Sequence, residues 1–183
     1  MSLWLRLVWA YLSWRSRGPL ELFSVGVRSF RVWPSDLDTF AHMNNGKFLT
    51  LLDLGRLDLF LRNRFWQKMK AKHWYPVVVA ETITFRKSLV LGQKFEIQSR
   101  VIGWDAISYY IEQRFVVAGE IYASAMVRGR FLSKAGKVLK PHEVMETITG
   151  SNEASPKVPK WVLDWAETTS LPRGKEPAPS LWD

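Results

Sequence analysis

The pattern of hydrophobic and polar residues predicts one strand and one long helix in the first third of the chain. Residues 25–33 alternate between apolar and polar positions well enough for a strand with one buried face. From Asn45 to about Arg64 the apolar residues instead recur at helical spacing and form a stripe along the helix. Further apolar residues widen this stripe until most of the helix circumference is apolar. Such a helix is expected to be buried rather than to lie on a surface.

The second half of the chain predicts antiparallel strands. Four runs suited to strands are separated by turns, two of which are short enough for hairpins. These runs are residues 77–85, 94–104, 107–117 and 121–133, and a short helix at 141–147 and a helical turn at 160–167 follow them. One strand, one buried helix and then a four-stranded meander is an α+β order. In this order a single antiparallel sheet must wrap around the helix.

The amino-terminal residues differ from this central part. Residues 3–14 are almost wholly apolar, include three of the ten tryptophans, and are followed by Arg15 and Arg17. The run is too short to span a bilayer, which takes about twenty residues, and it lacks the small-residue cleavage site of a signal peptide. A helix with tryptophan and arginine beside an apolar face fits two interpretations: an anchor at a membrane surface, or packing on protein.

Composition favours a single domain with short appendages. The chain has 183 residues, which is enough for one hydrophobic core but scarcely for two. We therefore divide it into an amino-terminal amphipathic helix, one folded domain, and a tail rich in proline and charge whose end we expect to be poorly ordered. The boundaries of these three parts are 1–17, 18–150 and 151–183.

Composition also excludes several kinds of chemistry. Without cysteine, the chain has no disulfide, no thiol nucleophile and no cysteine-based metal site. Its three histidines are too widely spaced for a recognisable metal motif, so we expect neither a metal nor an organic cofactor.

Lysine and arginine number 26 against 17 acidic residues, a net charge of +9 that attracts anions. No pattern of a nucleic-acid-binding module accompanies this charge, so nucleic acid is not an expected partner.

The segment between the predicted strand and helix carries the clearest chemical signal. Residues 36–49 read DLDTFAHMNNGKFL. This segment resembles the D-x-D-x-x-G-H-x-N-N-x-x-Y-L signature of acyl-CoA thioesterases of the 4-hydroxybenzoyl-CoA thioesterase type. The resemblance covers roughly residues 25–140 and implies a hotdog fold, an antiparallel sheet wrapped around a long central helix. The tryptophan-rich amino end is similar to that of the membrane-linked branch called thioesterase superfamily member six.

Three positions depart from the family pattern. Ala41 replaces the usual glycine, Phe48 the usual tyrosine and Asp53 the usual glutamate. The second change removes a hydroxyl that would contact substrate, and the third shortens a helical carboxylate. Arg56 matches the family's arginine, and at i, i+3 its simplest role is an ion pair with Asp53. We retain Asp53 as a second candidate carboxylate.

The residues of the motif also make chemical sense without the family. Asp38 places a carboxylate just ahead of a long helix, whose first N–H groups have no partner within the helix. Near Asn45 and Gly46 those groups would stabilise the oxyanion that forms when a thioester carbonyl is attacked. Asp38 would attack the carbonyl or take a proton from the attacking water, and His42 would assist. Asn44 or Asn45 is expected to cap the helix.

Other residues are candidates for binding substrate. Asn44 and Phe48 adjoin the motif, and Arg62, Arg64 and Lys68 belong to a basic stretch without acidic residues. In a thioesterase this stretch would meet the phosphates of coenzyme A, and its alternative interpretation is a solvated surface.

The favoured hypothesis is an enzyme that hydrolyses an acyl-CoA thioester and works as a homodimer or larger homo-oligomer. It would be cytoplasmic, and peripheral to a membrane if residues 1–17 contact lipid. One alternative is a non-catalytic, membrane-associated acyl-binding or scaffold protein. The other is a hydratase that adds water to an enoyl-CoA, although the usual Asp-x4-His spacing of such enzymes differs from the three residues between Asp38 and His42.

Overall fold

The computed structural model describes residues 3–172 and 176–180. Helices and strands occupy most of this range. The elements in chain order are α1 (Leu3–Ser13), the 3-10 helix η1 (Arg15–Arg17), β1 (Gly26–Arg31), the 3-10 helix η2 (Pro34–Asp36), α2 (Asn45–Arg62), α3 (Phe65–Ala71), β2 (Trp74–Phe85), β3 (Lys94–Trp104), β4 (Tyr109–Val117), β5 (Glu120–Ser133), β6 (Val138–Leu139), α4 (Pro141–Thr149) and α5 (Lys160–Thr168).

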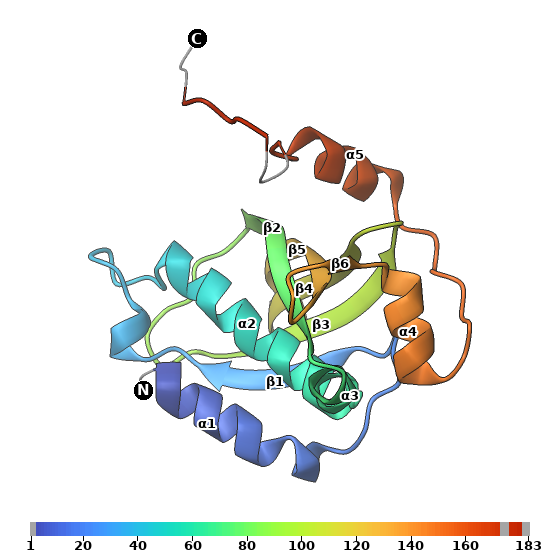
Figure 1. Cartoon of the computed structure of the whole chain (residues 1–183). Coiled ribbons are helices and arrows are strands. Elements are labelled where there is room, and N and C mark those ends of the chain that lie inside the picture. The colour runs from blue at the N-terminus through green and yellow to red at the C-terminus, as the bar shows by residue number, and fades with distance from the viewer. Residues whose placement is uncertain (1–2, 173–175, 181–183) are drawn as a thin grey trace.

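One antiparallel sheet wraps around α2, as the hotdog prediction requires (Figure 1). Its strand order is β1-β3-β4-β5-β2, and the short β6 pairs with β5. β1 precedes α2 in the chain and β2 follows it, so the two strands that flank the helix in sequence form opposite edges of the sheet. The turn between β1 and α2 therefore lies at the entrance of the central helix.

The central helix is buried, as its apolar circumference predicts. Leu51, Leu52 and Leu59 are almost fully buried between the helix and the sheet. At Gly55 a Cβ atom would lie 2.7 Å from the Cγ2 atom of Ile97, so only glycine allows the helix to approach β3 this closely. The position of α2 against the sheet is thus fixed by one small residue among large ones.

The sequence analysis predicted no element for residues 65–71, where α3 lies. The many lysines and arginines of this region indicated a solvated surface. However, Phe65 and Met69 are four residues apart and share one face of the helix, which is buried against the core. Two apolar residues at helical spacing were the signal that the charge obscured.

Helix α1 packs on the domain through a face that includes a charged residue. Arg6 and Ala10 point inward and are almost fully buried, whereas Trp4 is 77% and Leu12 73% exposed. The helix therefore rests on its own domain and also presents apolar side chains to the outside. None of the helices in the described part of the chain has the length and hydropathy needed to cross a bilayer.

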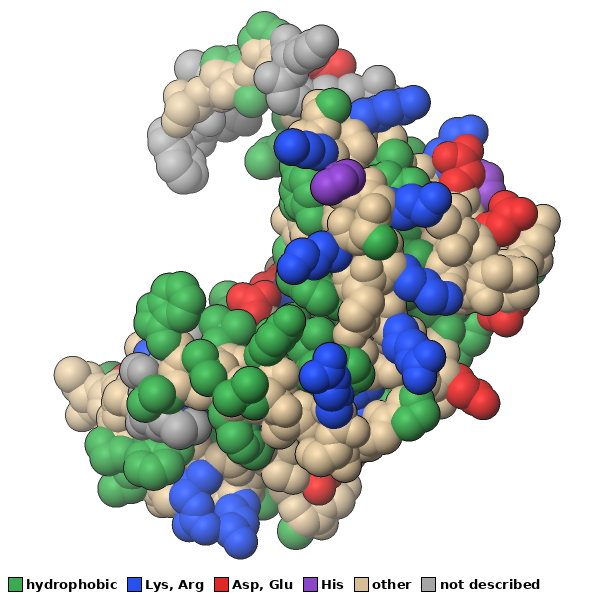
Figure 2. Space-filling model, turned by 60° about the horizontal axis from the view of Figure 1, so that its bottom comes forward, with side chains coloured by type: hydrophobic (Ala, Val, Ile, Leu, Met, Phe, Trp, Pro, Cys, Tyr) green, Lys and Arg blue, Asp and Glu red, His purple; other side chains and the backbone are tan. Residues whose placement is uncertain are grey.

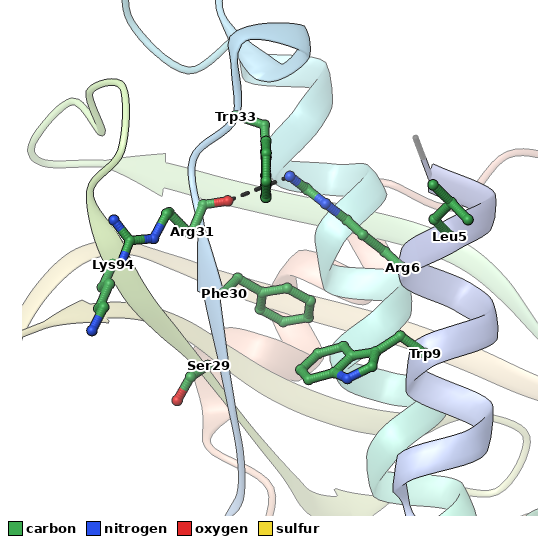
Figure 3. Close-up of a pocket in the computed structure, with 8 residues that line it drawn as sticks. All are labelled: Leu5, Arg6, Trp9, Ser29, Phe30, Arg31, Trp33 and Lys94. Atoms are coloured by element: carbon green, nitrogen blue, oxygen red, sulfur yellow. Dashed lines mark hydrogen bonds between the residues drawn. The ribbon is translucent and has the colours of Figure 1, made fainter. Parts of the chain in front are cut away.

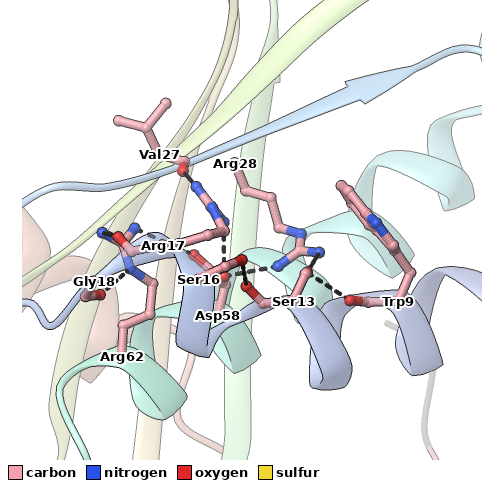
Figure 4. Close-up of polar contacts among 9 residues, drawn as sticks. All are labelled: Trp9, Ser13, Ser16, Arg17, Gly18, Val27, Arg28, Asp58 and Arg62. Carbon is pink, nitrogen blue, oxygen red and sulfur yellow. Dashed lines mark hydrogen bonds and ion pairs between the residues drawn. The ribbon is translucent and has the colours of Figure 1, made fainter.

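A cluster of three arginines around the buried carboxylate of Asp58 links the amino-terminal segment to α2 and β1 (Figure 4). The carboxylate of Asp58 accepts hydrogen bonds of 2.7 Å from both Arg17 and Arg28, and Arg62 lies 3.6 Å away. Arg28 also stacks its guanidinium 4.2 Å from the centre of the Trp9 ring. The carboxylate comes from the second half of the central helix, so segments far apart in sequence meet at one charge.

Helix α5 belongs to the folded body, although the sequence analysis assigned residues 151–183 to a tail. Val162 and Ala166 are buried against Tyr110 and Met126, on the sheet face opposite α2. Arg128 closes the end of the helix, because its Nη1 atom donates a hydrogen bond of 2.6 Å to the Ala166 carbonyl. Positions 173–175 and 181–183 of the predicted tail lie outside the described residues.

Candidate active site

The turn that leads into α2 is closed by backbone hydrogen bonds across its width. The amide of Asp38 donates to the His42 carbonyl at 2.8 Å, and the amide of Asn44 donates to the Asp36 carbonyl at 2.8 Å. Ala41 has a φ of +60°, in the left-handed region that favours glycine. This conformation is the one that favours the glycine of the related signature, and alanine adopts it here.

The carboxylate of Asp38 is half-buried and fixed to its own turn. Its Oδ1 atom accepts hydrogen bonds from the backbone amides of Phe40 at 2.9 Å and His42 at 3.2 Å. No hydrogen bond to its Oδ2 atom is found within the described residues. One oxygen therefore orients the group, and the other is left to act on a ligand.

The N-cap of α2 lies six residues after Asp38, and the helix begins at the next residue. Asn44 is the N-cap of α2, and it is one of the two residues that were expected to cap the helix. Its side-chain oxygen accepts a hydrogen bond from the Gly46 amide at 2.8 Å. The amide of Asn45 has no hydrogen-bond partner among the residues that the structure describes. Of the two predicted oxyanion donors, Gly46 is thus engaged by the cap and Asn45 is open.

His42 lies on the same turn and is exposed. It forms an isolated antiparallel bridge with Val90, next to the Leu89 carbonyl that accepts the Met43 amide at 2.8 Å. The backbone of the motif is therefore anchored on both sides. The side chains of Asp38 and His42 stand on one short loop directly before the helix entrance.

Phe48 is a core residue rather than a surface contact within this chain. Its ring lies 5.0 Å from that of Phe85 and 4.7 Å from that of Phe115, and only 2% of the residue is exposed. The family tyrosine is replaced here by a ring that completes an aromatic cluster.

Asp53 forms the predicted ion pair with Arg56, and the arginine has further partners that sequence reasoning missed. Arg56 is almost fully buried and lies 2.5 Å from the carboxylate of Glu81 on β2 and 2.8 Å from the side-chain oxygen of Gln113. Burial raises the pKa of Glu81, and the positive charge of Arg56 opposes that shift. The signal available in the sequence was a single acidic residue in an otherwise uncharged strand.

The structure does not bring Arg62, Arg64 and Lys68 to the Asp38 turn within one chain. Arg62 is sixteen residues beyond Gly46 on the same helix, a distance of about 24 Å at 1.5 Å per residue. Its side chain donates to the backbone carbonyls of Arg17 and Gly18, and the Lys68 side chain donates to Ile148. Together with Arg15 these three residues line a groove of about 470 Å³ at the far end of α2.

Among the described residues, no three histidine, aspartate or glutamate side chains gather into a group able to hold a metal ion.

Comparison with known proteins identifies relatives along most of the chain. Residues 32–166 match the family model described as the thioesterase-like superfamily. The protein THEM6 of Xenopus laevis is 34% identical over 134 residues, which cover 73% of this chain and 63% of that protein. The protein THEM6 of Danio rerio is 30% identical over 162 residues, which cover 88% of this chain and 79% of that protein. The chain thus spans slightly less than two thirds of the length of the Xenopus relative.

Solved structures show the same architecture. The probable thioesterase YbaW from Escherichia coli superposes with a TM-score of 0.63 at 24% identity, covering 69% of this chain and 98% of that one. The gentisyl-coenzyme A thioesterase BH1999 gives a TM-score of 0.59 at 17% identity, covering 66% and 98%. These similarities confirm the hotdog fold.

Proposed function

The chain belongs to the thioesterase-like superfamily, and from this premise we propose that it hydrolyses the thioester bond of an acyl-coenzyme A, releasing a carboxylic acid and coenzyme A. The observation that supports the proposal most directly is the turn before α2. There, a carboxylate with one oriented and one open oxygen precedes in sequence a helix whose first amide is open. Gentisyl-coenzyme A thioesterase, one of the structural neighbours, acts on a thioester of the proposed class.

In the proposed reaction the thioester carbonyl lies at the start of α2, where the Asn45 amide and the positive end of the helix dipole stabilise the developing oxyanion. Asp38 acts in one of two ways. Its open oxygen attacks the carbonyl carbon, which expels the coenzyme A thiolate and leaves a mixed anhydride that water then hydrolyses. Alternatively, it takes a proton from a water molecule that attacks the same carbon. In either route we assign to His42 the assisting role of donating a proton to the departing thiolate.

A panel of acyl-CoA substrates with detection of the free thiol tests this proposal. We expect turnover by the wild type and a loss of about a hundredfold or more in Asp38→Asn. The asparagine oxygen still accepts the Phe40 and His42 amides, so the turn should keep its shape. Full activity in Asp38→Asn contradicts the assignment of Asp38. Hydration of an enoyl-CoA without thiol release supports the hydratase alternative, and acyl-CoA binding without any turnover supports the scaffold alternative.

A single turnover in ¹⁸O-labelled water separates the two routes for Asp38. Attack by the carboxylate forms the anhydride, and water that hydrolyses it at the aspartyl carbon places ¹⁸O in Asp38 and leaves one original Asp38 oxygen in the product. Direct attack by water, or hydrolysis of the anhydride at the acyl carbon, leaves Asp38 unlabelled. ¹⁸O found by mass spectrometry in the peptide that contains Asp38 therefore identifies a nucleophile, and trapping of the anhydride with hydroxylamine separates the two unlabelled cases.

We further propose that two copies associate through β2. This strand is twelve residues long and forms one edge of the sheet, where Tyr75, Val78 and Val79 are more than 40% exposed. The other edge strand, β1, is covered by the amino-terminal segment, because Arg17 donates to the carbonyl of Val27 and Arg6 to that of Arg31. A long, apolar, uncovered edge is the one suited to pairing with a second copy.

Sedimentation analysis of Val78→Lys tests this interface, with Ser29→Lys on β1 as a matched control. We expect a dimer for the wild type and for the control, and a monomer for Val78→Lys. A dimer that persists in Val78→Lys but dissociates in Ser29→Lys would contradict the proposal, because the interface would then lie at β1.

The exposed side of α1 favours a peripheral membrane association. Figure 2 shows hydrophobic side chains gathered on the face that α1 presents, with Lys and Arg side chains nearby. Trp4, Leu5 and Leu12 are each more than half exposed, and Arg15 and Lys70 line the groove of about 560 Å³ between this helix and α3. Aromatic and aliphatic side chains beside positive charge suit the boundary of a bilayer with anionic lipids.

Vesicle flotation with anionic phospholipid tests this association. Deleting residues 1–17 would also remove Arg6 and Arg17, the partners of the buried carboxylates of Asp36 and Asp58, so point variants are preferable. We expect Trp4→Gln combined with Leu12→Gln to lose vesicle binding, whereas Leu171→Gln, which changes an exposed leucine elsewhere, should keep it. Equal flotation of all three proteins removes the membrane proposal.

A further inference from the structure

One charged residue of α1 reaches the turn that carries Asp38. The Nη2 atom of Arg6 lies 2.5 Å from the Oδ2 atom of Asp36, and both side chains are only 3% exposed. Arg6 lies outside the range that matches the thioesterase-like family, which begins at residue 32, whereas Asp36 is the first acidic residue of the motif. The pair therefore links an element specific to the amino-terminal segment to the family's functional turn.

Asp36 in turn holds both ends of that turn. Its Oδ2 atom accepts the Trp33 amide at 2.9 Å on the incoming side, and its backbone carbonyl accepts the Asn44 amide at 2.8 Å on the outgoing side. Asn44 caps α2, and Asp38 lies between the two contacts. The position of Asp36 therefore affects both the carboxylate proposed to react and the helix entrance proposed to hold the oxyanion.

Arg6 also contacts the end of β1, the strand before the turn. Its guanidinium donates to the carbonyl of Arg31, the last residue of β1, at 3.4 Å (Figure 3). In the same view Arg6 extends from α1 toward Trp33, past the apolar groove between α1 and β1. One side chain thus ties α1 to the strand before the turn and, through Asp36, to the turn itself.

We propose that Arg6 is a positioning residue of the thioesterase site, acting through Asp36 to keep Asp38 and the start of α2 in register. This inference rests on the function proposed above. Removing the guanidinium leaves the Asp36 carboxylate buried without its charged partner, and a buried unpaired charge favours any rearrangement that brings it to water. Such a shift moves both ends of the turn, and displacements of about 1 Å in a reacting geometry cost up to about a hundredfold in rate.

Arg17 provides a matched control from the same segment. It too forms an ion pair with a buried carboxylate and donates to a β1 carbonyl, but its partner is Asp58 and its strand contact is Val27. Asp58 lies in the second half of α2, more than a dozen residues beyond the cap. A general loosening of the amino-terminal segment would affect the Arg6 and Arg17 variants alike, whereas positioning through Asp36 would affect only the Arg6 variants.

Steady-state kinetics of the full chain with an acyl-CoA substrate form the first test. For Arg6→Met we expect kcat to fall between about tenfold and a hundredfold with KM changed by less than about threefold. Arg6→Lys should recover most of the loss because it restores the charge, and Arg17→Met should keep kcat within about twofold. Equal losses of kcat in Arg6→Met and Arg17→Met, or unchanged kcat in Arg6→Met, overturn the proposal.

The double variant Arg6→Met with Asp36→Asn separates position from stability. It removes both buried charges, and the introduced asparagine side chain still has an oxygen to accept the Trp33 amide. We expect thermal stability close to that of the wild type, with kcat still reduced at least about fivefold because neither the ion pair with Asp36 nor the contact of Arg6 with the Arg31 carbonyl then holds the turn. If kcat returns together with stability, Arg6 serves the fold alone and the proposal is wrong.

Hydrogen–deuterium exchange reports on the turn without any substrate. The amides of Asp38 and Asn44 are hydrogen-bonded across the turn, so their exchange should accelerate at least about tenfold in Arg6→Met and remain unchanged in Arg17→Met. Unchanged exchange in Arg6→Met overturns the proposal. Should the wild type show no thioester hydrolysis at all, the proposed function fails, and the exchange result still decides whether Arg6 orders the turn.

Discussion

Replacing Asp58 with asparagine should be among the most destabilising changes in this protein. The Asp58 side chain is 1% exposed, as is that of Arg28, which donates to it at 2.7 Å (Figure 4). Burial lowers the pKa of Arg28, and the negative charge of Asp58 opposes that effect. In Asp58→Asn the amide oxygen still accepts a hydrogen bond, but the negative charge that faces Arg28 is lost. Besides that oxygen, the guanidinium keeps the Ser13 hydroxyl at 3.0 Å and the faces of the Trp9 and Phe30 rings.

The size of the effect follows from these contacts. At an effective dielectric constant of about 20, two unit charges about 4 Å apart attract by roughly 4 kcal/mol. Repulsion among the arginines and their lost hydration offset part of the gain, and breaking a buried pair from one side typically costs about 3–5 kcal/mol. At roughly 2–4 °C per kcal/mol for a chain of this size, the melting temperature should fall by roughly 6 to 20 °C.

Urea unfolding and thermal melting followed by circular dichroism measure this loss. Asp164→Asn is the matched control, because it removes an ion pair with Lys160 in which both side chains are more than half exposed, and such pairs contribute little. Combining Asp58→Leu with Arg28→Met removes both charges and should recover part of the stability. A change below about 1 kcal/mol in Asp58→Asn, or equal losses in Asp58→Asn and Asp164→Asn, would refute the reasoning.

Three further predictions concern individual carboxylates. Asp38→Asn should lose at least about a hundredfold in kcat/KM with its melting temperature nearly unchanged, measured by thiol release and circular dichroism. Asp53→Asn should lose much less activity, because the Asp53 side chain is 68% exposed and is occupied by Arg56; a loss as large as that of Asp38→Asn would make Asp53 the principal carboxylate. Burial acts to raise the pKa of Glu112, but hydrogen bonds from two arginines outweigh it and hold that pKa below the usual 4.5. The stability contributed by Glu112 is therefore present above that value and lost as pH falls through the lowered pKa, so the difference between wild type and Glu112→Gln in urea unfolding should shrink as pH falls below 4.5.

The order of elements and the motif were predictable from the sequence because both depend on neighbouring residues. The wide apolar surface of residues 45–62 predicts a buried helix, and the strand 94–104 is found with the predicted limits. The cap at Asn44 likewise follows from a local rule, since asparagine at a helix start accepts a nearby amide. Strand β2 begins three residues before its predicted start, and α3 was missed, because charge obscured a short apolar face.

The tertiary structure alone decided which of these residues act together. Nothing in the local pattern pairs Arg6 with Asp36, or Glu81 with Arg56, because each pair joins segments at least twenty-five residues apart. The same limit separated the basic residues from the motif, because the sequence did not show that a rigid helix holds Arg62 at the far end of α2 from the Asp38 turn. Periodicity reports which side of an element is buried, whereas the identity of the partner across the core depends on how the sheet wraps around the helix.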